Sequence, residues 1–144
     1  MPLLQSAVSL VADRMPETIE PKAHAILDYA MAGAFITAGA LFWRRHRRAA
    51  IGSFICGGTI AATSMLTDYQ GGLADKVSYD THGKIDAGVA GLASAIPSAM
   101  FFRKDPQAKF FLAAGIAATV ITALTNYTSS QRQATKTWTE RSVA

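Results

Sequence analysis

The chain has 144 residues, enough for one domain, and half of them are hydrophobic while only 17% are charged. Ordinary soluble domains carry about 25% charged residues, so the composition argues against a typical soluble protein. There is a single cysteine, which excludes an intrachain disulfide, a cysteine-based zinc site and covalent haem attachment. The net charge is +4, but membrane topology accounts for it, so nucleic-acid binding is not expected.

The first segment, residues 1–22, is predicted to form an amphipathic helix that lies on the membrane surface and ends near Pro16. The alternative is a frayed tail. A secretory signal peptide is not expected, because no basic region leads the segment and Asp13 and Arg14 interrupt its apolar part. Its apolar residues follow the i, i+3, i+4 spacing of a helix, at Leu3, Leu4, Ala7, Val8, Val11 and Met15.

Four nearly charge-free runs of 15 to 19 residues follow, at Tyr29–Trp43, Ala49–Thr67, Ala87–Phe102 and Phe110–Thr125. A helix needs about 20 residues to cross the hydrocarbon core of a bilayer, so each run must include flanking residues to span it. One such run fits a buried helix of a soluble protein. Four of them, separated by short charged or Gly-rich links, predict an all-α, integral membrane four-helix bundle.

The chain repeats itself at an offset of 58 residues. This offset carries His24 to His82 and Asp28 to Asp86, and it also carries "LTDY" (66–69) onto "LTNY" (124–127). The pattern predicts two tandem repeats of a transmembrane helical hairpin, at residues 23–69 and 82–127. An outer connecting loop, 70–81, joins them, and a polar tail, 128–144, follows. Because each unit crosses twice, the repeats are parallel and both His–Asp pairs lie at one depth.

The links within the two hairpins are basic, "RRHRR" (44–48) and "RKDPQAK" (103–109). Short loops rich in Lys and Arg stay in the cytoplasm, so both termini and the central loop are predicted to face outward. Small residues recur at every fourth position and predict close helix contacts. They are Ala30, Ala34 and Ala38, then Gly57 and Ala61, and then Gly91, Ala95 and Ala99.

The stretch "HGKIDAGVAGLASAIPSAMFF" (82–102) resembles the helix unit of small bacterial membrane proteins called SPW-repeat proteins. In that family a His and an Asp at a helix entrance precede a Ser-Pro-Trp near the far end. Here Pro97 holds the proline position, while Ile96 and Ser98 replace the other two and Gly39 replaces the proline in the first repeat. The resemblance implies a four-helix fold in the bacterial inner membrane, and no settled chemistry.

The His–Asp pairs have a structural interpretation. Residues i and i+4 share a helix face, so each His can bond the Asp of its own helix, and a carboxylate in the first turn favours the helix dipole. Asp80 or Thr81 is expected to cap the third span. Neighbouring helices are expected to supply three further polar side chains, Tyr69, Asn126 and Tyr127.

A functional interpretation uses the same residues as ligands. Imidazole and carboxylate suit a divalent transition metal, and the candidate ligands are His24, Asp28, His82, Asp86 and Asp68. Bis-histidine haem and a bound proton or small polar ligand are the other possibilities. No catalytic residue is assigned, because Ser78 and Thr81 stand near His82 only in sequence.

The sequence therefore predicts a multi-pass membrane protein with a structural or accessory role. Membership of a larger membrane complex and self-association are both left open by the sequence. The rival is an outward-facing His/Asp site for a transition metal, a proton or a small polar ligand. An enzyme ranks third. No cofactor is predicted outright.

Overall fold

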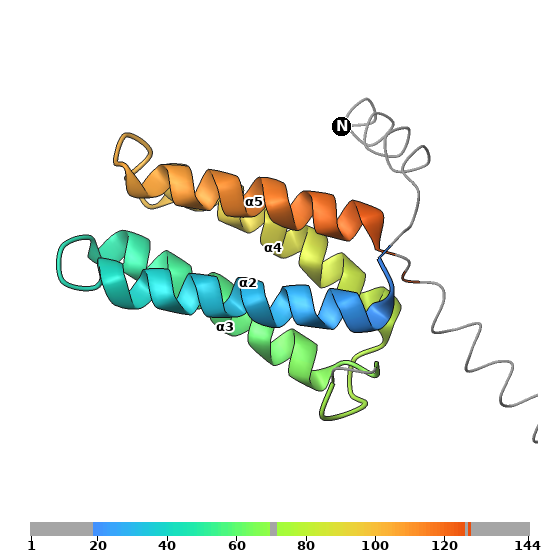
Figure 1. Ribbon diagram of the computed structural model, residues 1–144. Coiled ribbons are helices and arrows are strands. Elements are labelled where there is room, and N and C mark those ends of the chain that lie inside the picture. Colours follow the sequence, from blue (N-terminus) through green and yellow to red (C-terminus); the bar gives the residue numbers. More distant parts are fainter. Residues whose placement is uncertain (1–18, 70–71, 126, 128–144) are drawn as a thin grey trace, which may run out of the picture.

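The computed structural model describes residues 19–69, 72–125 and 127, and these residues form four α-helices (Figure 1). In the labels of that figure they are α2 (Pro21–Phe42), α3 (Arg47–Leu66), α4 (Tyr79–Ala99) and α5 (Gln107–Leu124). The described chain is helical, as predicted. The predicted surface helix up to residue 18 and the polar tail from 128 lie outside the described residues.

Consecutive helices pair as two antiparallel hairpins, α2 with α3 and α4 with α5 (Figure 1). Most of the contact between the hairpins is made by α3 and α4, whereas α2 and α5 touch only slightly. The bundle is therefore two tight hairpins joined mainly along one pair of helices.

Both helices that carry a His–Asp pair begin before the apolar runs. Pro21 opens α2, where its fixed φ suits the first turn. Ser78 is the N-cap of α4, and its Oγ accepts a hydrogen bond from the Thr81 backbone N–H at 3.3 Å. The predicted cap at Asp80 or Thr81 is wrong, because both residues already lie in the first turn. The helix thus starts inside the predicted connecting loop, and the His–Asp pairs lie within helices.

Among the described helices, α2, α3 and α5 are long and apolar enough to cross a membrane, with 22, 20 and 18 residues. At 1.5 Å per residue they measure about 27–33 Å, close to the roughly 30 Å hydrocarbon core. The sequence predicted four spans. Helix α4 has 21 residues but falls short in hydropathy, because its first two turns carry Asp80, Lys84 and Asp86.

An apolar core fills the bundle beyond the His–Asp pairs. Phe35 of α2 and Phe111 of α5 are almost fully buried, and their ring centroids lie 6.0 Å apart. Gly57 lets α2 and α3 approach closely, because a Cβ there would lie 3.1 Å from the Ala32 carbonyl oxygen. The rest of the buried core comprises Ala32, Ala49, Cys56, Ile60, Val89, Ala93, Ile96 and Phe102.

Most of the predicted small-residue contacts are absent from this bundle. Ala30 and Ala34 are exposed on α2, and Gly91, Ala95 and Ala99 are exposed on α4. The buried face of each helix instead continues along the helix from its His and Asp, with a buried residue every three or four positions. On α2 this face includes His24, Asp28, Ala32, Phe35 and Gly39, and on α4 it includes His82, Asp86, Val89, Ala93 and Ile96.

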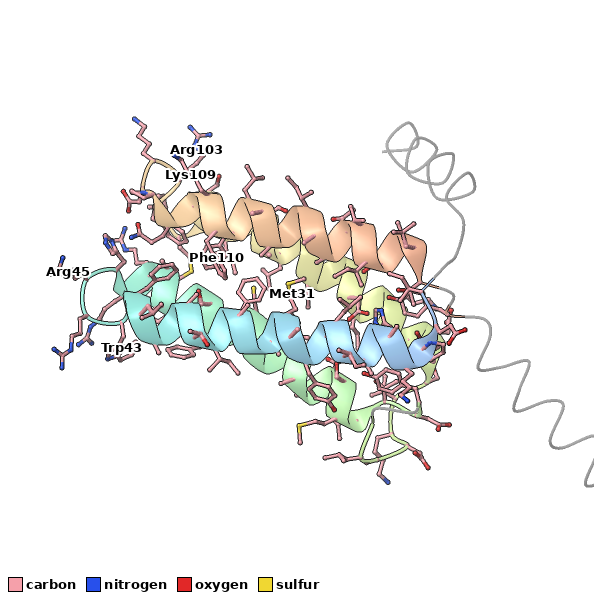
Figure 2. The ribbon with its side chains drawn as sticks, viewed as in Figure 1. Met31, Trp43, Arg45, Arg103, Lys109 and Phe110 are labelled. Carbon is pink, nitrogen blue, oxygen red and sulfur yellow. The ribbon has the colours of Figure 1, made fainter. Side chains whose placement is uncertain are left out.

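The outward surface is apolar along the helices and basic at one end. Leu41 is 76% exposed and Ile116 is 58% exposed, and α5 buries only Phe111 and Gly115. The two hairpin loops lie at the same end of the bundle, where Figure 2 shows Arg45, Arg103 and Lys109. The His–Asp pairs belong to the opposite end.

Candidate metal centre

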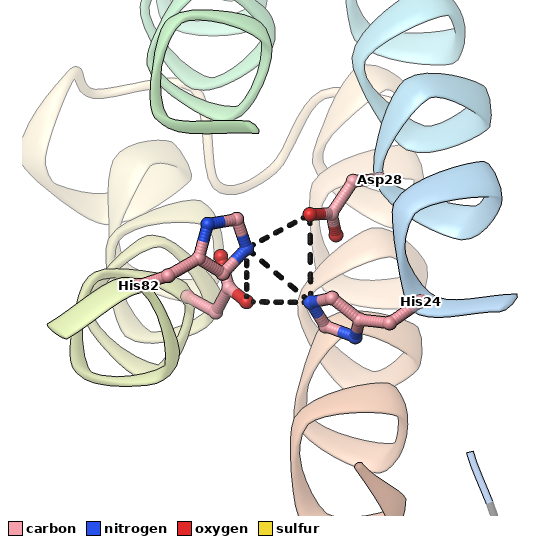
Figure 3. Close-up of side chains that lie close together, drawn as sticks. His24, Asp28 and His82 are labelled. Carbon is pink, nitrogen blue, oxygen red and sulfur yellow. Dashed lines mark hydrogen bonds and ion pairs between the residues drawn. The ribbon is translucent and has the colours of Figure 1, made fainter. Parts of the chain in front are cut away.

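His24 and Asp28 of α2 meet His82 and Asp86 of α4 in one buried cluster (Figure 3). Both histidines are fully buried, and the aspartates are 7% and 8% exposed. One ligand atom from each residue can be chosen so that all four lie within 4.8 Å of one another. The structure thus brings together four of the five ligands that the sequence nominated.

The shortest contacts in this cluster cross between the hairpins. His24 Nε2 lies 3.0 Å from Asp86 Oδ2, and His82 Nε2 lies 2.9 Å from Asp28 Oδ2. Within each helix the corresponding distances are 3.4 Å for His24–Asp28 and 3.1 Å for His82–Asp86. The two Nε2 atoms are 3.3 Å apart. Each histidine therefore contacts both carboxylates.

Two threonines at the ends of α3 and α5 hold the opposite edges of the imidazole rings. His82 Nδ1 lies 2.7 Å from Thr67 Oγ1, and His24 Nδ1 lies 2.9 Å from Thr125 Oγ1. Each threonine hydroxyl donates its one hydrogen to a backbone carbonyl, of Thr63 or Ile121, at 2.6 Å. Each threonine oxygen therefore accepts from an Nδ1–H, because a hydroxyl has only one proton to donate.

In the neutral form of each imidazole, this assignment leaves the Nε2 lone pair facing the aspartates. Two lone pairs and two carboxylates at 2.9–3.4 Å repel one another unless positive charge lies between them. Either two protons or one divalent cation neutralises the group. With two protons, each Nε2–H would donate to the facing carboxylate, at 3.0 Å for His24–Asp86 and 2.9 Å for His82–Asp28, but two N–H groups would then lie at the 3.3 Å Nε2–Nε2 distance, which a metal ion avoids.

Further donors reach the same carboxylate oxygens. Ser64 Oγ donates to Asp28 Oδ2 at 2.8 Å, and Tyr127 Oη donates to Asp86 Oδ2 at 3.0 Å. Burial raises the pKa of the Tyr127 phenol, so it stays protonated and able to donate at neutral pH. Hydrogen bonds of this kind orient the ligands of metal centres and tune their basicity.

An aromatic layer surrounds the histidines. Tyr79 and Tyr127 have ring centroids 4.9 Å apart, and Tyr69 stacks on Tyr79 at 5.5 Å. Tyr127 also lies edge-on to His24 at 5.4 Å. Tyr79 is only 2% exposed. These rings cover the histidines with apolar surface, and a low local dielectric strengthens the electrostatic interactions of the cluster.

The donor set fits a tetrahedral divalent transition metal. Bonds of about 2.0–2.1 Å to a tetrahedral ion place neighbouring ligand atoms about 3.3–3.4 Å apart. The five nitrogen–oxygen and nitrogen–nitrogen separations are 2.9–3.4 Å, close to this spacing, and the whole set of four ligand atoms lies within 4.8 Å. Mg²⁺ and Ca²⁺ fit poorly, because they prefer six or more oxygen ligands.

A haem does not fit between the two histidines. Axial ligands stand on opposite faces of the macrocycle, which needs open space in the plane between them. Here Asp28 and Asp86 occupy that space, each within 3.4 Å of both Nε2 atoms.

The remaining predicted site residues do not all lie in the cluster. Asp68 is exposed and does not belong to the cluster. Tyr69 and Tyr127 pack against the histidines, and Tyr127 bonds Asp86. Asn126 lies outside the described residues.

Sequence reasoning missed Ser64, Thr67, Tyr79 and Thr125 as members of the site. A signal for the threonines was present, because Thr67 and Thr125 are identical letters within "LTDY" and "LTNY". Asp68 and Asn126, the position at which those motifs differ, were predicted as site residues instead.

Contacts in the two hairpins recur at the 58-residue offset. His24–Thr125 corresponds to His82–Thr67, and the two cross-hairpin His–Asp contacts exchange with each other. The residues before each helix follow the same rule. The Ile19 backbone N–H donates to the Leu124 carbonyl at 3.0 Å, and the Val77 N–H donates to the Leu66 carbonyl at 2.9 Å. The residue just before each hairpin therefore hydrogen-bonds to the last helix of the other hairpin.

Comparisons of the chain with protein-family models, curated proteins and solved structures gave no significant match.

Proposed function

We propose that this protein is a multi-pass membrane protein whose two hairpins are joined by a buried divalent transition-metal ion. The metal is held by His24 Nε2, His82 Nε2, Asp28 Oδ2 and Asp86 Oδ2. Its role is structural or accessory: it fixes the two hairpins relative to each other at the end of the bundle away from the basic loops.

The observation that carries the metal is the direction of the histidine nitrogens. Both Nδ1 atoms are engaged by threonine hydroxyls whose only proton is already donated to a carbonyl. Both Nε2 atoms therefore face the carboxylates, and in neutral imidazoles their lone pairs are available to a metal ion. A divalent cation has the charge that two neutral imidazoles and two carboxylates require, and N/O ligand sets of this kind suit Zn²⁺ and its neighbours in the first transition row.

The membrane setting is supported by the apolar lengths of α2, α3 and α5 and by their exposed large side chains. We propose that α4 also spans, because its charged first turns are directed into the cluster or to the helix end, where Lys84 pairs with Asp80 at 2.7 Å. The basic loops at one end then favour a cytoplasmic location for that end and an outward location for the metal.

We also propose that the two hairpins are a tandem duplication, which the recurrence of contacts at the 58-residue offset supports. The resemblance to SPW-repeat proteins and a location in the bacterial inner membrane belong to the same proposal. Association with other membrane subunits or with itself is proposed from the exposed apolar faces.

Metal analysis of the detergent-purified full chain tests the metal proposal. We expect one Zn²⁺ or Co²⁺ per chain after loading and desalting, and loss of that metal in His24→Ala and in His82→Ala. His46→Ala is the matched control, because the third histidine lies in the basic loop end, outside the cluster. A wild-type protein that retains no metal at micromolar concentration, or His variants that retain it fully, would overturn the proposal.

A further inference from the structure

A cavity of about 20 Å³ lies between the two hairpins beside the metal ligands. His24, Asp28 and Asp86 line one side of it, and His82 does not. The remaining walls come from all four helices and are mostly apolar, with Met31, Ile60, Val89, Ala118 and Ile121, joined by Thr122. The cavity therefore adjoins three of the four candidate ligands.

This cavity is distinct from the position of the metal itself. The two Nε2 atoms are 3.3 Å apart, and each lies 2.9–3.4 Å from both Asp Oδ2 atoms, so the space among them suits bonds of metal–ligand length, about 2 Å. A water oxygen needs about 2.7–2.8 Å to each hydrogen-bond partner and cannot sit there. The cavity is additional space next to the ion.

We propose that the bound metal has a fifth, exchangeable coordination position that opens into this cavity and takes one water molecule. This inference rests on the proposed metal site. A volume of 10–15 Å³ is enough for one water, so about 20 Å³ admits a ligand of one heavy atom and little more. Metal centres that exchange ligands keep such a position open, whereas purely structural zinc sites are closed by four protein ligands.

The charge of the metal site and the apolar walls of the cavity both favour a neutral ligand. Two carboxylates already neutralise a divalent ion, and the apolar walls make an additional negative charge costly. Water, or another neutral Lewis base of one heavy atom such as ammonia, meets both conditions. Thr122 supplies a hydroxyl in the cavity wall that can hydrogen-bond such a ligand.

Ala118 offers a way to block the position without touching a ligand. It lies on α5 in the cavity wall, so a larger side chain there fills the space that the water needs. The preceding residue, Ala117, is exposed on the same helix and provides a matched control. Ala118→Leu is the stronger block, and Ala118→Val is the milder variant should the leucine disturb folding.

The test uses the full chain in detergent, loaded with Co²⁺, and records its electron paramagnetic resonance spectrum in ordinary water and in water enriched in ¹⁷O. The nuclear spin of ¹⁷O broadens the lines when the oxygen is bound to the metal. We expect broadening in the wild type and in Ala117→Leu, and its loss in Ala118→Leu or Ala118→Val at an unchanged one Co²⁺ per chain.

Two results would overturn the fifth position while leaving the metal site intact. One is a wild-type protein with one Co²⁺ per chain and no broadening, and the other is equal broadening in the wild type and in both Ala118 variants. Failure of the wild type to bind Co²⁺ stoichiometrically would overturn the proposed function and this inference together.

Discussion

His24 lies closer to Asp86, 62 residues away on the other hairpin, than to Asp28 on its own helix. The Nε2–Oδ2 distances are 3.0 Å and 3.4 Å. Helices α2 and α4 otherwise have little contact, so this crossing makes the cluster a joint between the hairpins. A substitution in one His–Asp pair should therefore change the contribution of the other pair to the free energy of unfolding.

The first prediction concerns the coupling between the two aspartates. Asp28→Ala and Asp86→Ala should each destabilise the bundle, and the double variant should cost less than the sum. Each single change already breaks the shared cluster, and groups in one network couple by about 0.5–3 kcal/mol. Thermal or denaturant unfolding of the single and double variants in detergent measures the difference.

Asp80→Ala is the control for this cycle, because Asp80 pairs with Lys84 at the exposed start of α4. Combined with Asp28→Ala it should be additive within about 0.5 kcal/mol. Equal additivity for the Asp28 and Asp86 pair would mean that the two aspartates act independently.

The second prediction concerns metal removal. A ligand that binds the folded state stabilises it by RT ln(1 + [L]/Kd), about 2.7 kcal/mol at a free concentration 100 times Kd. A strong chelator should therefore lower the midpoint of thermal unfolding, and added Zn²⁺ should restore it. His46→Ala should respond as the wild type does, and His82→Ala should respond to neither reagent. If neither the chelator nor Zn²⁺ changes the unfolding midpoint of the wild type, the carboxylates of the cluster are neutralised by protons and not by a metal ion.

The third prediction concerns the threonine that orients His82. Thr67→Val keeps the shape of the side chain but removes the oxygen that accepts the Nδ1–H. Loss of a hydrogen bond that orients a metal ligand typically costs 10- to 100-fold in affinity, so we expect about that loss for Co²⁺. Thr67→Ser should retain affinity near that of the wild type. Titration followed by the visible absorption of Co²⁺ measures both, and an unchanged affinity in Thr67→Val would remove Thr67 from the site.

The fourth prediction compares four glycines. A Cβ on Gly57 would lie 3.1 Å from the Ala32 carbonyl oxygen, and one on Gly115 would lie 3.2 Å from the Ala90 carbonyl oxygen. Alanine at either position should destabilise the bundle by about 1–3 kcal/mol through overpacking. Gly91 has nothing within 4 Å of such an atom, and neither has Gly33.

Gly33→Ala and Gly91→Ala should therefore be neutral or stabilising by up to about 1 kcal/mol, because alanine is the better helix former. Unfolding in detergent checks all four variants. A large loss at Gly91 would instead indicate that its exposed face packs against another protein in the detergent-purified sample.

The fifth prediction concerns membrane topology. In a Cys56→Ser background, Asp75→Cys in the loop between α3 and α4 should react with an impermeant thiol reagent added to intact cells. Lys104→Cys, in the basic loop between α4 and α5, should react only after the membrane is opened. The reverse pattern would invert the orientation, and recovery of folded protein in the soluble fraction without detergent would overturn the membrane proposal.

The sequence by itself determined the helical class and the location of the His–Asp pairs. In a bilayer, long apolar runs with few charges form helices, because no water is present there to bond the backbone and a helix satisfies its backbone groups within the segment. The 58-residue offset likewise predicted that His24 and His82 share a depth, and the structure places their Nε2 atoms 3.3 Å apart.

Helix faces were decided only by tertiary packing. The fourfold spacing of Ala30 and Ala34 predicted a contact face, but these residues are exposed and His24 and Asp28 face inward instead. Composition alone does not orient a helix that is apolar all round, because its surface offers no strong contrast between faces. The burial of the paired polar groups sets the rotation.

The partners of each histidine were also beyond the sequence. Spacing of i and i+4 identifies neighbours on one helix, so Asp28 was the expected partner of His24. The shorter contact with Asp86 and the hydrogen bond with Thr125 depend on how two hairpins meet. Those contacts direct both Nε2 atoms toward the two carboxylates, and they bring the two His–Asp pairs together as one candidate metal site.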